Sequence, residues 1–414
     1  MPAFMVMNSR PKILFVTPHS PWAAAYGGQQ RTLNIGKLLS RVGDISFVIT
    51  PAEGDYEETA NHKNGDFKVR RIVRPVLVSC AGNHLARLRH RIRYELDANY
   101  LATHHYTTSE ADRRALQELV QEHDLVWVHT IRAANLFGID RWPHSVLDVD
   151  DLLSRVYRAE ANSGSAIIRK LLDLRLAWMW RRRERRFNRR FDVLTVCSEG
   201  DRRYLGSSEQ IHVIPNGFNP QPTPTKAPLA PSAQPRIGFI GTLRYRPNED
   251  GVRWFIREVW PLVKSRVPEA QLRLVGRDSD GPIAQMGRDV VGLGYLEDPS
   301  DEIAAWSAMI VPVRFGGGTR IKTAEAFARK CPVVATTMGA FGYDVCNGEE
   351  IFLADQAQDF ASACINLLRE PQLGVALSER AYRRFVERWT WDSFQGSVEA
   401  VIEDCLSRSR SLAL

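Results

Sequence analysis

The sequence lacks the features that mark disulfide-rich, metal-binding and membrane-spanning proteins. No pair of cysteines has the short spacing of a metal site or a redox motif, so we expect a reducing compartment. No run approaches the ~18 apolar residues of a spanning helix. The N-terminal stretch MPAFMVMNSRPKILFVTP has no long apolar run behind a basic start, so no cleaved secretion signal is expected. The six cysteines are Cys80, Cys197, Cys331, Cys346, Cys364 and Cys405.

The composition is that of a globular protein with a modest excess of positive charge. With 414 residues, 44% of them hydrophobic and 25% charged, the chain is long enough for two or three domains with sizeable cores. The net charge of +7 indicates an anionic partner. Charge alone does not choose among a nucleotide, a membrane surface and nucleic acid.

Short apolar runs alternate with helical patterns along the chain. KILFVTP, GGQQRTLNIGKLLSRVG and ISFVIT read as strand, helix and strand, which predicts a parallel sheet. DLVWVHT, HSVLDVDD and DVLTVCSEG continue this first series of strands. A second series consists of RIGFIGTL, AQLRLVG, MIVPVRFG, CPVVATT and IFLAD. The pattern therefore predicts an α/β fold with two parallel-sheet, Rossmann-like domains.

A proline-rich segment of low periodicity, residues 216–235, separates the two series and reads as a linker. The predicted domains are residues 1–215 and 236–385, with a C-terminal helical segment at 386–414. Two such domains would face a cleft, and open parallel sheets bind ligands at the carboxyl ends of their strands. The residues that follow each strand are therefore the site candidates.

Two glycines and a histidine follow strands of the first series. Gly27 and Gly28 would let a ligand approach the backbone, and a helix N-terminus there offers N–H groups to an anion. A plain turn explains them equally well, because the third glycine of a dinucleotide motif is missing. His129 ends the run DLVWVH, where an imidazole could hydrogen-bond a substrate hydroxyl or stabilise developing charge. The alternative is a structural or exposed histidine.

Three carboxylates crowd the stretch LDVDDLLS, namely Asp148, Asp150 and Asp151. They repel one another unless they are solvated or bind a cation or hydroxyl groups. One interpretation is a divalent metal site that bridges to a diphosphate, and another is an acceptor contact at the rim of the cleft. A third is that Asp150 or Asp151 caps the next helix near Ser154.

Residues 167–192 are strongly basic and carry apolar residues at roughly helical spacing. They fit an amphipathic helix on an anionic membrane surface. They fit equally a helix that packs its apolar stripe inside and leaves its arginines in water. Nucleic acid is not predicted as a partner, because no recognised binding module accompanies the segment. The stripe would consist of Ile168, Leu171, Leu172, Leu176 and Trp180.

In the second series, GTLRYRPNEDG follows the first strand, and VPVRFGGGTRIKTAEAF contains a later one. Gly241 would allow a close approach, and Arg244 or Arg246 could reach a diphosphate. The later stretch has three glycines at a helix start, then Arg320 and Lys322. Cations there oppose the helix dipole unless they are solvated or meet an anion.

Glu325 follows Lys322 by one helical turn. Its carboxylate could accept hydrogen bonds from two hydroxyls, as a ribose offers them. The alternative is an ion pair within the helix, with Lys322 or Arg329.

With these residues in view, the chain resembles the retaining GT-B-fold glycosyltransferases of family 4, the glycosyl transferases group 1. The resemblance extends over nearly the whole chain. It rests on GGQQR, VCSEGDRRYL, IHVIPNGFN and IGFIGTL, and above all on PVRFGGGTRIKTAEAFARKCPVVATTMGAFGY. It implies two Rossmann-like domains that face a cleft, with the C-terminal helix crossing back onto the first domain.

The resemblance also implies roles for individual residues. Glu325 would hold the donor ribose, and Arg320 and Lys322 would act as catalytic cations beside the diphosphate. His129 would lie near the transferred sugar as a third catalytic residue. Asp148, Asp150 and Asp151 would stand on the acceptor side. Further donor contacts would come from Gly27, Gly28, Gly241, Arg244, Gly316, Gly317, Gly318 and Thr319.

Two departures from the family pattern concern the donor sugar and the diphosphate. Many members carry a second glutamate eight residues before the ribose-binding one, where this chain has Gly317. Many also have an arginine and then a lysine after the first strand of the second domain. GTLRYRPNEDG holds no lysine, which weakens the assignment of Arg244 or Arg246.

The implied reaction moves a sugar from a nucleotide diphosphate, UDP or GDP, to an acceptor hydroxyl with retention. Fixed cations and N–H groups would stabilise the leaving diphosphate, so no metal or other cofactor is expected. Domain closure with residues 216–235 as one hinge is also expected. The acceptor would be a saccharide or lipid-linked saccharide of polysaccharide or glycoconjugate biosynthesis. The location would be cytoplasmic, peripheral on the inner face of the membrane if residues 167–192 bind it.

Two classes of alternative function remain open at this point. One is a nucleotide-sugar epimerase or a phosphorylase on the same fold, although no pyridoxal-phosphate lysine or free-phosphate signature is evident. The other is a non-catalytic protein that binds membrane surfaces through residues 167–192.

Overall fold

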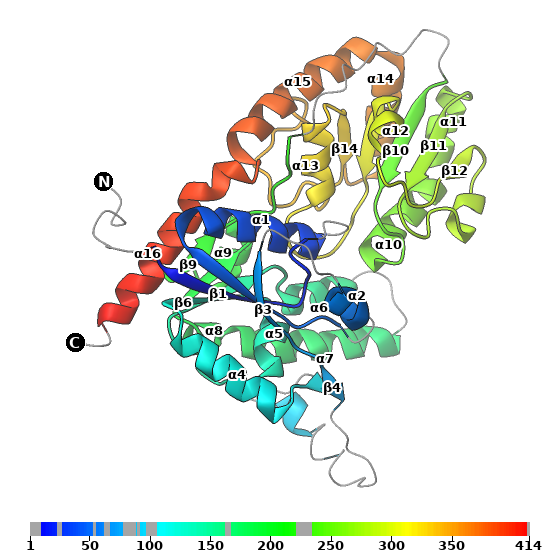
Figure 1. Ribbon diagram of the computed structural model, residues 1–414. Coiled ribbons are helices and arrows are strands. Elements are labelled where there is room, and N and C mark those ends of the chain that lie inside the picture. The colour runs from blue at the N-terminus through cyan, green and yellow to red at the C-terminus, as the bar shows by residue number, and fades with distance from the viewer. Residues whose placement is uncertain are drawn as a thin grey trace. The chain divides into compact units, whose positions relative to one another are not determined.

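The computed structural model describes residues 10–22, 27–52, 55–61, 67–77, 88, 92–96, 106–161, 167–220 and 234–411. The chain divides into two compact units, Met1–Pro215 with Phe394–Leu414 and Asn216–Ser393. Each unit is built on its own parallel sheet (Figure 1). The predicted α/β fold class is therefore confirmed.

The first unit has a seven-stranded sheet in the order β3-β2-β1-β6-β7-β8-β9, and every neighbouring pair is parallel. Its central strands are buried along their length, because helices follow parallel strands and cover both faces of such a sheet. The strands are β1 (Lys12–Thr17), β2 (Asp44–Ile49), β3 (Lys68–Ile72), β6 (Leu125–His129), β7 (Ser145–Val149), β8 (Val193–Val196) and β9 (Ile211–Val213), with a separate antiparallel pair, β4 (Val76–Leu77) and β5 (Tyr106–Thr107).

The helices of the first unit include one that returns from the C-terminal end of the chain. This helix, α16 (Gln395–Ser411), contacts α1 and strands β6 to β9. His212 on β9 lies 2.9 Å from the carboxylate of Asp404 on α16. The other helices are α1 (Gly27–Val42), α2 (Tyr56–Asn61), α4 (Glu110–Gln121), α5 (Ile131–Leu136), α6 (Leu153–Ala161), α7 (Ile167–Glu184), α8 (Phe187–Arg190) and α9 (Glu199–Leu205).

The second unit has a six-stranded parallel sheet in the order β12-β11-β10-β13-β14-β15. Its strands are β10 (Arg236–Ile240), β11 (Gln271–Val275), β12 (Val290–Gly292), β13 (Ala308–Val311), β14 (Val333–Ala335) and β15 (Phe352–Leu353). Its helical segments are α10 (Arg246–Trp254), η3 (Phe255–Val259), α11 (Trp260–Arg266), η4 (Pro282–Gln285), α12 (Ser300–Ala304), α13 (Ile321–Ala328), α14 (Ala357–Arg369) and α15 (Pro371–Arg388), and η5 (Asp392–Phe394) precedes α16.

The strands that the sequence analysis missed lie at the edges of the sheets. β3 and β9 end the first sheet, and β12 ends the second. β3 has three charged residues among its five and none that is fully buried, and β9 and β12 have three residues each. An edge strand is half exposed and short, so it leaves no long apolar run in the sequence.

Helices α6 and α7 pack against each other, and α7 contradicts one expectation. Of the expected inward stripe, Trp180 is buried and Leu176 is half-buried, but Ile168, Leu171 and Leu172 are exposed. The buried face of α7 carries Asp173, Ala177, Met179, Trp180, Arg183 and Glu184 instead. Among the residues that the structure describes, no helix is long and apolar enough to span a bilayer.

The predicted linker begins with residues that belong to the second unit. Asn216 is buried, and Phe218 is buried and donates its N–H to the carbonyl of Trp389 at 3.1 Å. Residues 221–233 of the predicted linker lie outside the described residues. The predicted boundaries at 215, 235 and 385 stay a prediction.

Candidate functional site

In the first unit, the candidate residues lie where β1, β6 and β7 end side by side. His129 is the last residue of β6 and is fully buried. Its Nδ1 lies 3.1 Å from the Thr32 hydroxyl, which lies 3.0 Å from the Thr17 hydroxyl. Within the described residues, the buried Nε2 has no hydrogen-bond partner. One ring nitrogen is therefore held by the fold, and the other is left for a ligand.

Burial keeps the His129 ring neutral. Burial lowers the pKa of His129 more than the carboxylates of Asp148 and Asp150 raise it. A neutral imidazole can donate a hydrogen bond through Nε2, or accept one there, depending on its tautomer.

His19, which the sequence analysis missed, packs against His129. The two ring centroids are 5.5 Å apart, with the rings nearly perpendicular. Burial, and then the neighbouring His129, lower the pKa of His19 to about 3. A Cβ at Gly28 would lie 2.4 Å from His19 Nε2, so the glycine makes room for this ring. A histidine two residues after the first strand, in VTPHS, was the available signal.

The backbone just after His129 is strained. Thr130 has φ = 67°, which is rare for a β-branched residue, and it donates its N–H to the Asp148 carbonyl at 3.0 Å. Such conformations persist only where the surrounding structure enforces them, and they gather at functional sites. The strain adds to the argument that the end of β6 is functional.

Asp148 has a structural partner that the sequence analysis did not foresee. It is fully buried, and Arg31 donates to Oδ1 at 2.6 Å and to Oδ2 at 3.0 Å. Thr195 also donates to Oδ1 at 2.6 Å. Burial would raise the pKa of Asp148, but Arg31 outweighs it and holds that pKa below its usual range. Asp148 therefore has a structural role at the edge of the sheet, and its expected acceptor-side role stays a prediction.

The two neighbouring carboxylates are closer to solvent. Asp150 is half-buried, with the Cys197 thiol 3.5 Å from its Oδ1, and Asp151 is exposed. At the start of α6, the Ser154 N–H donates to Glu184 of α7 at 2.9 Å. The acceptor-side and capping interpretations of Asp150 and Asp151 stay predictions.

In the second unit, Lys322 lies at the end of β10 although it belongs to α13. Its Nζ donates to Asn248 Oδ1 at 2.5 Å and lies 4.5 Å from the centroid of the Phe239 ring. A Cβ at Gly241 would stand 3.1 Å from this Nζ. Burial, and then the charge of Arg320, lower the pKa of Lys322 to about 7, against the opposing effect of Glu325.

Asn248 positions Lys322 and had not been singled out from the sequence. Its Nδ2 donates to the Thr242 carbonyl at 2.9 Å, which leaves Oδ1 to accept from Lys322. The lysine that lies at the turn after β10 therefore comes from another element, α13. Arg244 of the same turn is exposed and pairs with Asp278 at 3.1 Å, so its donor role stays a prediction.

Arg320 holds the glycine-rich loop from within. It is buried, and it donates to the carbonyl of Gly317 at 2.9 Å and to that of Met338 at 3.2 Å. Gly316 and Gly318 have φ of 129° and 65°, and a Cβ at Gly316 would lie 2.8 Å from the Arg320 guanidinium. Arg320 therefore holds the conformation of the loop, and its predicted contact with the diphosphate stays a prediction.

The PNG element is tied to the same loop. The Asn216 N–H donates to the hydroxyl of buried Thr319 at 2.9 Å, and the Tyr343 hydroxyl donates to the Arg320 carbonyl at 3.1 Å. A Cβ at Gly342 would lie 2.1 Å from the Thr319 methyl group. Thr319 thus joins two stretches that the sequence analysis quoted separately, IHVIPNGFN and PVRFGGGTRIKTAEAFARKCPVVATTMGAFGY.

Glu325 forms the ion pair within its helix that the sequence left open, and its predicted contact with a ribose stays a prediction. Its Oε1 accepts from Arg329 at 3.0 Å, which is the expected ion pair within the helix. Burial raises the pKa of Glu325, and Arg329 and then Lys322 oppose that rise. In the part of the chain that the structure describes, this pair engages one carboxylate oxygen, which leaves Oε2 to accept from a ligand.

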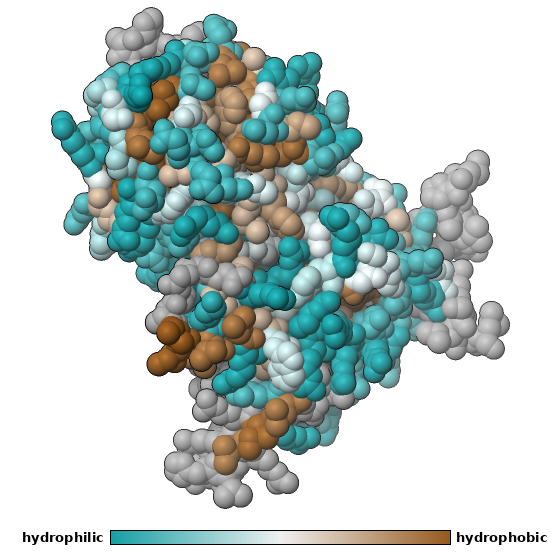
Figure 2. Space-filling model, turned by 180° about the vertical axis from the view of Figure 1, so that it is seen from behind, coloured by the Kyte–Doolittle hydropathy of each residue, from teal (hydrophilic) through white to brown (hydrophobic). Residues whose placement is uncertain are grey.

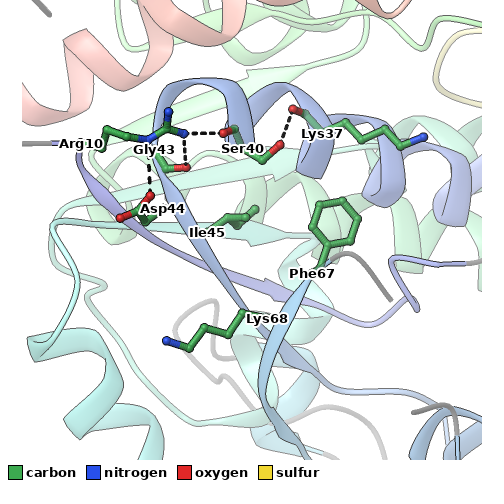
Figure 3. A pocket seen from close by; sticks show the side chains of 8 residues that line it. All are labelled: Arg10, Lys37, Ser40, Gly43, Asp44, Ile45, Phe67 and Lys68. Atoms are coloured by element: carbon green, nitrogen blue, oxygen red, sulfur yellow. Dashed lines mark hydrogen bonds and ion pairs between the residues drawn. The ribbon is translucent and has the colours of Figure 1, made fainter. Parts of the chain in front are cut away.

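A groove in the first unit lies at the other edge of the sheet (Figure 3). Asp44 and Lys68, which line it, begin β2 and β3, whereas His129 ends β6. Arg10 in this groove donates to the Ser40 carbonyl at 2.6 Å and pairs with Asp44 at 3.4 Å. The groove is therefore not part of the candidate site.

One group of described residues has the composition of a metal site, Cys346, Glu349 and Glu350. Glu350 already accepts from the Cys346 N–H at 2.8 Å and from Arg384 at 2.9 Å. None of the predicted site residues belongs to this group.

The structural role of Asp148 gives a first prediction. Asp148→Ala would leave the buried charge of Arg31 without its carboxylate, although the Ile214 carbonyl still accepts from it at 3.0 Å, and breaking a buried ion pair in this way typically costs about 3–5 kcal/mol of stability. Urea denaturation followed by circular dichroism measures this loss. Glu118→Ala, which removes an exposed carboxylate of α4, is the control and should change stability by less than about 0.5 kcal/mol. Equal stability of the two variants would contradict the structural assignment.

Comparisons with known proteins bear on the family and the fold. Residues 234–370 match the family model of glycosyl transferases group 1. The chain is 23% identical over 375 residues to an uncharacterized 44.6 kDa protein in the cps region of Klebsiella pneumoniae, covering 86% of this chain and 90% of the relative.

Two solved structures share the fold across nearly the whole chain. Sucrose-phosphate synthase from Thermosynechococcus elongatus has a TM-score of 0.65 and 15% identity, covering 96% of this chain and all of that one. Anabaena HepE, solved with UDP and glucose, has a TM-score of 0.60 and 16% identity, covering 95% and 99%.

The GT-B fold predicted from the sequence is confirmed by these structures. The match in the second unit agrees with the predicted glycosyl transferases group 1, whereas retention and family 4 stay predictions. The chain therefore has the GT-B fold of these structures, and its residues 234–370 match the glycosyl transferases group 1.

Proposed function

We propose that the protein transfers a sugar from a nucleotide-diphosphate donor to an acceptor hydroxyl with retention of the anomeric configuration. The observation that carries this proposal is the environment of Lys322. The half-buried side chain of Lys322 brings its ammonium to the carboxyl end of β10, where the missing Cβ of Gly241 leaves room for it, beside a glycine-rich loop at a helix start. Such a position binds a phosphate anion.

The donor is proposed to be a UDP- or GDP-sugar. HepE, which shares the fold, was solved with UDP and glucose, and this supports a uridine donor. The free oxygen of Glu325 would accept from a ribose hydroxyl, and backbone N–H groups of residues 316–319 would face the phosphates. No resident metal or cofactor enters the proposal.

Catalysis would rest on charge placed where the leaving group develops it. The diphosphate gains negative charge as the bond to the sugar breaks, and Lys322 would stabilise that charge without reorganisation, since Asn248 already fixes its position. Arg320 would act through the loop it holds. In the first unit, Nε2 of His129 would hydrogen-bond a hydroxyl of the sugar, and Gly27 and Gly28 would admit the donor.

The acceptor is proposed to be a saccharide or lipid-linked saccharide of polysaccharide or glycoconjugate biosynthesis. The relative from the cps region of Klebsiella pneumoniae supports this part of the proposal. Asp150 and Asp151 are the acceptor-side candidates closest to solvent. We place the reaction in the cytoplasm, because the five described cysteines are all free thiols.

Binding of the donor gives the test of the donor site. UDP- or GDP-sugars at 100 times their Kd should stabilise the protein by about 2.7 kcal/mol, seen as a rise in Tm. Lys322→Ala and Glu325→Ala should remain folded and lose most of this rise. Lys37→Ala, which removes an exposed lysine of α1, is the control. If either variant keeps wild-type affinity for the donor, the donor-binding role of the residue it replaces is contradicted.

The lowered pKa of Lys322 makes donor binding depend on pH. A bound diphosphate favours the ammonium, so the pKa of Lys322 rises above about 7 in the complex. Binding then takes up a proton, and affinity should fall by up to about tenfold per pH unit as the pH rises above 7. Isothermal titration with an intact nucleotide sugar between pH 6 and 9 measures this, since its phosphates do not titrate there. Lys322→Ala should bind weakly and without this dependence, and a pH-independent wild type would contradict the assignment.

The role of His129 is tested by turnover. His129→Ala should lower kcat on the order of 100-fold, because it removes a fixed hydrogen bond at the reacting sugar. The Tm rise with nucleotide should stay, because this binding is assigned to the second unit. His123→Ala is the control, since His123 precedes β6 and bonds the Leu119 carbonyl. Unchanged kcat in His129→Ala would remove it from the mechanism.

Turnover also separates the alternatives. An epimerase would convert the nucleotide sugar without an acceptor, and a phosphorylase would need free phosphate or pyridoxal phosphate. A non-catalytic membrane protein would bind lipid after loss of Glu325 and show no transfer at all.

A further inference from the structure

Helix α7 exposes its apolar residues and buries charged ones. The exposed fractions of Ile167, Ile168 and Leu171 are 78%, 75% and 62%, and that of Trp178 is 55%. Leu172 and Leu174 are exposed as well. On the other side, Asp173, Ala177 and Glu184 are buried at helical spacing. A soluble helix normally shows the reverse pattern.

A second described segment extends this surface. Glu95 pairs with Arg175 of α7 at 2.5 Å, and the Leu96 carbonyl accepts from Arg182 at 3.1 Å. Ile92 and Leu96 are 48% and 61% exposed. Figure 2 shows hydrophobic residues gathered in the lower part of the surface in view. The α7 patch is defined by Ile92, Leu96, Ile167, Ile168, Leu171, Leu172, Leu174 and Trp178.

The charge around the α7 patch is positive. Residues 167–192 contain ten arginines and lysines against three acidic residues, a net charge of +7 that equals that of the whole chain. Lys170 and Arg175 are exposed on the same helix, and Arg182 stacks on Trp178 with its guanidinium 4.6 Å from the ring centroid. The nearby carboxylates of Glu95 and Glu160 pair with Arg175 and Arg169.

We infer that the α7 patch docks onto the surface of an anionic lipid bilayer. Apolar side chains bordered by long cationic ones fit the boundary between acyl chains and headgroups, because the stems of lysine and arginine bury while their charges reach phosphate. A tryptophan beside an arginine is typical of that boundary. The patch is a surface attachment, as α7 is not apolar enough to span a bilayer. This inference does not depend on the donor site.

The test is co-sedimentation of the full chain with vesicles. Wild type should bind vesicles of phosphatidylglycerol and phosphatidylcholine at low salt and bind pure phosphatidylcholine at least about tenfold more weakly, since the cations contribute through anionic headgroups. Ile168→Ser with Leu171→Ser should lower binding to the anionic vesicles about tenfold or more, because each exposed side chain inserts apolar carbons. Both positions are exposed, so folding should be unchanged.

The control replaces exposed apolar residues elsewhere. Val375→Ser with Tyr295→Ser removes two side chains of the second unit that are 52% and 58% exposed, and it should bind vesicles like wild type. Three results would overturn the inference: no binding of wild type to anionic vesicles at low salt, equal binding by both double variants, or a dimer by light scattering that Ile168→Ser with Leu171→Ser dissociates. The Tm rise with nucleotide is measured on the same samples. It shows whether the donor site binds, so a failure of vesicle binding can be told apart from a failure of the donor site.

Discussion

Lys322 carries its ammonium into surroundings where burial has removed the water that normally solvates it. Three features of the second unit make this tolerable: an amide oxygen from Asn248, the face of Phe239 and the absence of a side chain at Gly241. Together they hold the charge in place without neutralising it. A buried cation with one neutral hydrogen-bond partner favours an anion nearby, and the glycine-rich loop and the helix start supply further positive potential.

In the first unit, the buried charges are neutralised by pairing with each other. The ion pair of Arg31 and Asp148 is satisfied on both sides and adds little net charge to the edge of the sheet. Burial keeps His129 beside it neutral, with Nδ1 held by the Thr32 hydroxyl and the buried Nε2 without a hydrogen-bond partner among the described residues. A neutral ring among neutralised charges suits recognition of a sugar hydroxyl, which carries no charge itself.

Much of the fold was predictable, because buried parallel strands leave unmistakable apolar runs and the strand ends identify the ligand edge. The candidate residues at those ends, His129 and Lys322, were found in this way. Their partners were not. Asn248 and Thr32 bind them through polar side chains that no period or motif singles out, and the pairing of Asp148 with Arg31 joins residues 117 apart. Such contacts depend on side-chain geometry across strands, which sequence spacing does not encode.

Arg320 is another case in which sequence spacing does not show the direction of a side chain. A cation after three glycines suggests a phosphate ligand, whether its side chain points out of the loop or back into it. The exposed stripe on α7 is a similar case. Periodicity predicts which residues share a face of a helix, and burial decides which face turns inward. Here Asp173 and Glu184 are held inside by local partners, and the apolar face is left outside.

The concentration of charge in residues 167–192 has a consequence beyond contact. The rest of the chain carries 45 cationic and 45 acidic residues, so the excess charge of the molecule is localised in this one segment. A molecule charged in this way has a strong dipole as seen from a distance. In the field of an anionic surface it experiences a torque as well as an attraction, and it turns its basic segment toward that surface within about one Debye length, roughly 8 Å at physiological salt. Orientation is then set before any side chain inserts.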